Sequence, residues 1–106
     1  MIVIRKKVGK WPQIIDVENT LEALQEEVGG YIETVTFAED ACIICDEEGR
    51  LKDKPHNVNL FGVDFVGTVL AVGVDGENFR GLDSRELGAL MSTFIKAYNV
   101  EKERQK

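Results

Sequence analysis

The sequence predicts an α+β domain in which a mainly antiparallel five-stranded sheet carries two helices. Strand-like segments follow one another directly, which favours antiparallel pairing over alternating strand–helix units. Two further segments have apolar residues at helical spacing, and each begins with a capping-box pattern. The length of 106 residues, with 43% hydrophobic and 30% charged residues, is typical of one globular domain. The expected order is strand, strand, helix, strand, strand, strand, helix.

The first strands are expected at residues 2–7 and 13–17, where β-branched and apolar side chains gather. A helix follows, because Asn19 and Glu22 have the spacing of a capping box and apolar residues then recur every three to four positions. The pair Gly29-Gly30 is expected to end this helix, since glycine enters the left-handed conformation without steric cost.

Three more strands are expected at residues 31–38, 41–46 and 65–74. The second and third are apolar on both faces, and for the strand at 41–46 this predicts a central position in the sheet. The intervening segment 51–64 shows no hydrophobic period and is expected to be irregular. Such long irregular segments are uncommon in compact domains unless they have a function.

A second helix is expected after Asp83, with Glu86 completing its capping box. Its apolar residues form the clearest amphipathic pattern in the chain: Leu87, Leu90, Met91, Phe94, Ile95 and Tyr98. The chain after this helix is wholly polar. We therefore expect one domain over residues 1–100 and a frayed polar tail at 101–106.

Charge is distributed unevenly along the chain, whose net charge is −6. Eleven acidic residues and no lysine or arginine lie between Asp16 and Glu48. This block argues against direct nucleic-acid binding through residues 16–48. It suits either solubility or a basic protein partner. The candidate binding residues in it are Glu22, Glu26, Glu27, Asp46, Glu47 and Glu48.

No apolar run approaches the ~20 residues that a membrane span needs. At the N-terminus the apolar residues precede the basic ones, the reverse of a secretory signal. We therefore expect a cytoplasmic protein that does not bind membranes.

No familiar catalytic or cofactor-binding motif is present, so we expect a protein that is not an enzyme and uses no cofactor. His56 is the only histidine, and no phosphate-binding glycine loop precedes a helix. Cys42 and Cys45 could be a metal or redox pair. Because residues i and i+3 of a strand face opposite sides, we expect two diverging buried thiols and no metal site.

Two other places in the sequence suggest polar recognition. Gln25 borders the apolar stripe of the first helix, where its amide would brace a loop or hold the polar edge of a ligand. His56, Asn57 and Asn59 lie in the irregular segment, and loops often carry recognition. The alternative for His56 is a surface position or a role in bracing that loop.

Residues 15–25 and 28–33, followed by 45–51, Asn57 and 67–73, resemble a small bacterial and phage family that is classed only as a domain of unknown function. The resemblance implies genes carried by phages, plasmids and conjugative elements of Gram-positive bacteria. It brings no known activity, substrate or catalytic residue.

The leading hypothesis is a non-enzymatic accessory protein of a phage or mobile element. It would bind a host or phage macromolecule, expected to be a protein, through the acidic surface. The alternative is a small-ligand binder, such as a sponge for a nucleotide signal in anti-phage defence. The sequence leaves the identity of the partner and formation of a homo-oligomer open.

Overall fold

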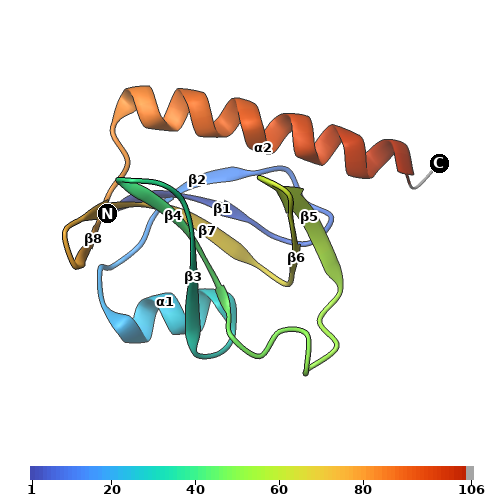
Figure 1. The fold of residues 1–106 in the computed structure, drawn as a ribbon, viewed down its shortest axis with the longest axis horizontal. Coiled ribbons are helices and arrows are strands. Elements are labelled where there is room, and N and C mark those ends of the chain that lie inside the picture. The colour runs from blue at the N-terminus through green and yellow to red at the C-terminus, as the bar shows by residue number, and fades with distance from the viewer. Residues whose placement is uncertain (105–106) are drawn as a thin grey trace.

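A six-stranded antiparallel sheet forms the centre of the chain, of which the computed structural model describes residues 1–104 (Figure 1). The strand order is β2-β1-β7-β4-β3, and β8 extends the sheet by pairing with β7. The α+β class, the two helices and the antiparallel pairing are confirmed. The bounds of these strands are β1 Ile2–Lys6, β2 Gln13–Asp16, β3 Ile32–Ala38, β4 Ala41–Asp46, β7 Val69–Asp75 and β8 Asn78–Arg80.

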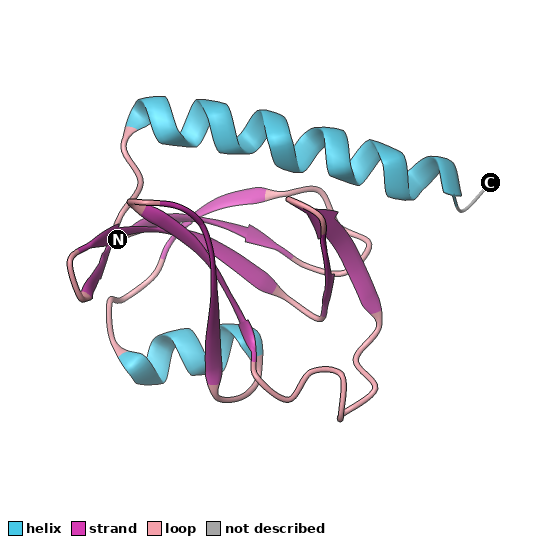
Figure 2. Cartoon of the chain, in the orientation of Figure 1, coloured by secondary structure: helices cyan, strands magenta, loops and turns pink. Residues whose placement is uncertain are grey.

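The two faces of the sheet are covered by different elements (Figures 1 and 2). Helix α1, Leu21–Val28, packs on one face against β3, β4 and β7. Helix α2, Ser84–Arg104, lies on the other face together with a separate hairpin of β5, His56–Leu60, and β6, Val63–Val66. The sheet is therefore the middle layer of three.

Each face has its own hydrophobic core because side chains alternate along the central strands. Ile43 of β4 packs with Phe94 of α2, whereas Ile44 packs with Leu24 of α1. Cys42 belongs to the α1 core and Cys45 to the α2 core. The expected divergence of the two thiols is confirmed.

The structure has eight strands where five were expected, and two of the three additional strands arise in residues 51–74. The segment 51–64 contains β5 and the start of β6, joined by a two-residue turn in which Phe61 and Gly62 have φ values of 53° and 80°. The single strand expected at 65–74 is interrupted by Gly67, whose φ is 69°. Strand β8 is also additional, so the expected five-stranded sheet and its element order were wrong.

The capping prediction was wrong by one residue for α1 and confirmed for α2. Thr20 is the N-cap of α1, and its hydroxyl accepts a hydrogen bond from the Ala23 amide at 3.2 Å. Asn19 instead donates to the carbonyl of Phe79. At α2, the Glu86 amide donates to Asp83 and the Asp83 amide donates to Glu86.

Helix α2 continues to Arg104, so residues 101–104 are helical where a frayed tail was expected. Residues 105–106 of that expected tail lie outside the described residues. Within residues 1–104, neither helix has the length and apolar character needed to cross a membrane.

Candidate functional site: a cleft beside the edge strand

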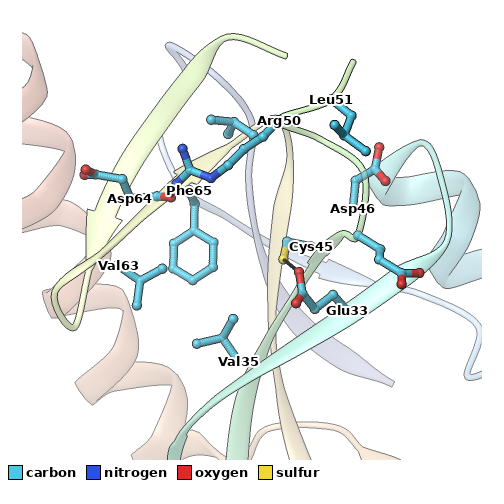
Figure 3. Close-up of a pocket in the computed structure, with 11 residues that line it drawn as sticks. Glu33, Val35, Cys45, Asp46, Arg50, Leu51, Val63, Asp64 and Phe65 are labelled. Atoms are coloured by element: carbon cyan, nitrogen blue, oxygen red, sulfur yellow. Dashed lines mark hydrogen bonds between the residues drawn. The ribbon is translucent and has the colours of Figure 1, made fainter. Parts of the chain in front are cut away.

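A cleft of about 150 Å³ opens between the β3–β4 face of the sheet and strand β6 (Figure 3). Its apolar surface comes from Val35 of β3, Cys45 of β4, and Val63 and Phe65 of β6. These side chains meet because the β5–β6 hairpin lies over the same face of the sheet as the α2 core. The remaining lining residues form a mainly polar rim with two aliphatic side chains: Glu33, Asp46, Glu47, Arg50, Leu51, Asp64 and Val66.

Several large apolar side chains around this cleft are exposed to solvent. Leu51 on its rim is 83% exposed, and Val63 is also exposed. Phe61, half exposed at the hairpin turn, stacks on Phe37 of β3 with 4.2 Å between ring centroids. Contiguous exposed apolar groups on a small domain are typical of an interaction site.

The rim carries an excess of negative charge. Glu33 and Glu47 line the cleft with a single arginine, Arg50, whose guanidinium donates to the backbone carbonyl oxygen of Asp64 at 2.6 Å. The Asp64 carboxylate points away from the cleft and accepts from Asn59 (Figure 3). A further carboxylate, Asp46, is buried and neutralised by lysines. The exposed part of the rim therefore favours a positively charged partner.

Strand β3 is one of the two ends of the main sheet order, so one side of its backbone is unpaired. The Glu47 amide donates to the Tyr31 carbonyl, and residues 32–36 continue this register against β4. In an antiparallel ladder, bonded and non-bonded positions alternate. The amides and carbonyls of Ile32, Thr34 and Thr36 therefore point away from β4.

The β3 edge carries few of the features that usually block strand addition. Its seven residues include no lysine and no proline, although a bulge lies near its end between Thr36 and Ala38. Native edge strands are commonly protected by such residues, by short length or by a covering segment. Residues 32–36 of β3 are thus available for pairing with another strand.

The thiol in the cleft is unsuited to thiolate chemistry. Burial, together with the neighbouring Glu33 and Asp46 carboxylates, raises the pKa of Cys45 to about 11. Burial likewise raises the pKa of Cys42 to about 11. Both thiols are therefore neutral at physiological pH, whereas nucleophilic attack and metal ligation require the thiolate. Within residues 1–104, no cluster of three histidine, cysteine or acidic side chains has metal-binding geometry.

Asp46 was expected to project into solvent, but it is buried and holds the loop between β4 and β5 in place. Its carboxylate lies 2.9 Å from the ammonium of Lys52 and 2.7 Å from that of Lys54. Burial alone would raise the pKa of Asp46, but hydrogen bonds from Lys54, Lys52 and the Glu48 amide outweigh it and lower the pKa to about 2.

The same lysines fix the end of helix α1. Lys54 donates to the carbonyl of Val28 at 2.7 Å, and Lys52 donates to that of Gly29 at 3.2 Å. These cations thus satisfy carbonyls at the negative end of the helix. A Cβ at Gly30 would lie 2.5 Å from the Asp46 carboxylate, which explains why glycine stands there.

The other acidic candidates are divided among different environments. Glu22, Glu26 and Glu48 are exposed, whereas Glu27 pairs with Arg5 at 3.1 Å. Glu47 joins Glu33 at the cleft. The side chain of Gln25 makes no hydrogen bond to any described residue, so neither of its expected roles is visible.

The three polar candidates of the hairpin also have separate environments. Asn57 is buried, and its amide donates to the carbonyls of Lys6 and Gly67, so it braces the backbone. His56 pairs with Glu101 at 3.0 Å, and Asn59 donates to the Asp64 carboxylate at 2.8 Å. The sequence analysis did not identify five residues at or beside the cleft: Glu33, Val35, Leu51, Phe61 and Val63. For the last three, the available signal was the presence of large apolar residues in the segment 51–64, which has no hydrophobic period.

Comparison with known proteins identifies a family but no characterised relative. A family model described as a domain of unknown function (DUF3846) matches residues 1–98. Neither a curated protein nor a solved structure matches the chain.

Proposed function

The chain belongs to the DUF3846 family, a domain of unknown function, and from the geometry of its cleft and edge strand we propose that it is a peptide-binding module. An extended basic segment of a protein partner would add as a strand to the open edge of β3 and place one apolar side chain in the cleft. The domain would act by binding and would carry out no reaction itself.

The single observation that carries this proposal is the coincidence of an open strand edge and an acidic cleft with an apolar floor. Val35 and Glu33 belong to the edge strand, and both also line the cleft. Main-chain pairing along an edge gives affinity, while pockets for alternate side chains give specificity. Both components are available at the same place.

The geometry specifies the spacing in the bound segment. Side chains directly opposite each other on neighbouring strands share a face of the sheet. The partner residue opposite Val35 would therefore point into the cleft, where an apolar side chain fits. The residue opposite Glu33 lies two positions away and would be lysine or arginine. In an antiparallel complex the partner sequence reads apolar, any residue, basic.

The size of the cleft favours a side chain over a complete small molecule. Its volume of about 150 Å³ is below the roughly 300–1,000 Å³ of usual ligand pockets. In this proposal, the acidic surface that was expected from the sequence to bind a protein partner is the rim of the cleft. The setting in a phage or mobile element that the resemblance implies remains part of the proposal.

Selection from a display library of random heptapeptides tests the proposed specificity. We expect enrichment of sequences with an aliphatic residue two positions before lysine or arginine, because Val35 and Glu33 are two positions apart. Binding measured by fluorescence anisotropy should weaken as salt increases, since exposed charges are screened. Enrichment of acidic peptides, or no enrichment, would contradict the proposal.

Variants of the edge strand separate strand addition from simple charge attraction. Thr34→Pro removes an outward amide without removing a bond to β4, so we expect at least ~10-fold weaker binding, about 1.4 kcal/mol. Thr34→Ala keeps the amide and should bind normally. Glu33→Lys should also weaken binding, whereas Glu26→Lys on α1 is the matched charge control. Equal binding by the two Thr34 variants would exclude pairing at this edge.

A further inference from the structure

A second cavity, of about 60 Å³, lies where the end of β1 and the start of β5 meet the last turns of α2. It is lined by groups from four segments: Lys6 of β1, the following loop at Val8 and Gly9, His56 and Asn57 of β5, and Tyr98, Glu101 and Lys102 of α2. It is thus formed by residues far apart in the chain.

Lys6 is one of the residues that line this cavity. Lys6 is only 1% exposed, and its Nζ donates to the Lys7 carbonyl at 2.7 Å and to Asn57 Oδ1 at 2.9 Å. These two acceptors leave one of its three N–H groups without a hydrogen-bond partner among the described residues, and the nitrogen lies 5.5 Å from the centroid of the Tyr98 ring. Among the described residues no carboxylate forms an ion pair with it.

A buried ammonium without a direct counter-ion is energetically unfavourable. Burial lowers the pKa of Lys6, and the charge of the nearby Glu101 opposes this shift only in part. Glu101 is already committed elsewhere, because it pairs with His56 at 3.0 Å and with Arg104 at 3.5 Å. A small anion in the cavity would supply the missing counter-charge.

The charged and aromatic lining consists of two lysines, Lys6 and Lys102, the Tyr98 ring, His56 and the Glu101 carboxylate. Lys102 lies over the Tyr98 ring at 5.5 Å from its centroid, as Lys6 does. Trp11, half exposed, contacts the same ring edge-on at 5.2 Å. A neighbouring surface hollow is lined by Trp11 with Lys7, Lys10, Arg5 and Gln13. Cations beside an exposed aromatic ring are the usual means of holding a phosphate next to a flat base.

We propose that this cavity is a phosphate-binding site, with the phosphate held by Lys6 and Lys102 beside Tyr98. The source is either free phosphate or the phosphate of a nucleotide whose base lies against Trp11. The site uses none of the residues that line the peptide cleft, so it stands independently of the proposed peptide binding.

Titration of the intact protein with inorganic phosphate, AMP and adenosine tests the site, with NMR shifts of the Gly9 amide and Trp11 indole as the readout. Sodium chloride at matched ionic strength controls for screening. Phosphate and AMP should give saturable shifts, and adenosine should not. Tighter binding of AMP that Trp11→Ala removes would identify a nucleotide; equal affinities would identify free phosphate.

Lysine variants assign the effect to the cavity. Lys102→Gln should weaken phosphate binding at least ~10-fold, because it removes one of two cations. Lys96→Gln removes the same charge from an exposed position of the same helix and should bind normally. Lys6→Met adds a second test if the variant folds. No saturable shift with phosphate or AMP, or equal affinities of the Lys102 and Lys96 variants, would overturn the proposal.

Discussion

Truncation of Phe94 to alanine is expected to destabilise the domain by about 3–5 kcal/mol, the usual range for a buried phenylalanine. Phe94 has no exposed surface and joins α2 to Ile43 of the sheet and Phe65 of the hairpin. This loss would be a large part of the ~5–15 kcal/mol that stabilises a typical domain. Urea denaturation followed by circular dichroism measures it.

Val100→Ala is the matched control, because Val100 lies on the same helix with half of its surface exposed. Its cost should remain near ~0.5 kcal/mol, as for most surface substitutions. A loss below ~1 kcal/mol for Phe94→Ala would mean that α2 is not part of the core.

Substitution of Asp46 by asparagine is expected to cost about 3 kcal/mol, because it removes the buried carboxylate shared by two lysines. The side chain keeps its shape, so the effect reports the loss of the charge and of one acceptor oxygen. Glu48→Gln, at an exposed neighbouring position, is the control and should change stability by less than ~0.5 kcal/mol. Similar denaturation midpoints for the two variants would exclude a structural role for the Asp46 ion pairs.

The same pair of proteins gives a pH test. The pKa of Asp46 is lowered from 3.8 to about 2 in the folded protein, so its contribution is present above pH 3.8. It is lost as the pH falls toward 2, because the carboxylate then becomes protonated in both states. The stability difference between wild type and Asp46→Asn should therefore narrow across this interval. A difference that is constant with pH would contradict the low pKa.

Patterns that depend on near neighbours were predictable from the sequence. The amphipathic spacing and the Asp83–Glu86 box located α2, because both act within one or two turns of a helix. The β5–β6 hairpin was not predicted, because its turn uses Phe61 and Gly62 in left-handed conformations instead of the common Asn-Gly pair. The break in the strand at Gly67 was not predictable for a similar reason. Only the structure shows the positive φ of Gly67 and the Lys54 side chain packed against it.

The candidate cleft depended on contacts between distant segments, which local patterns do not contain. The acidic block was visible, but the sequence could not separate Glu47 at the rim from its neighbour Asp46. That distinction arises because Lys52 and Lys54, outside the block, fold back onto Asp46. Likewise, Val35 became a candidate only when the hairpin was seen to lie over β3.

Amide hydrogen exchange, measured by NMR with and without a selected peptide, tests strand addition at β3 most directly. In the free protein the outward amides of Thr34 and Thr36 should exchange rapidly, while those of Glu33 and Val35, which face β4, should be protected. A saturating peptide should slow the Thr34 and Thr36 amides at least ~10-fold, because they become bonded to the added strand. Saturable peptide binding that leaves both exchange rates unchanged would contradict the proposed mode of binding.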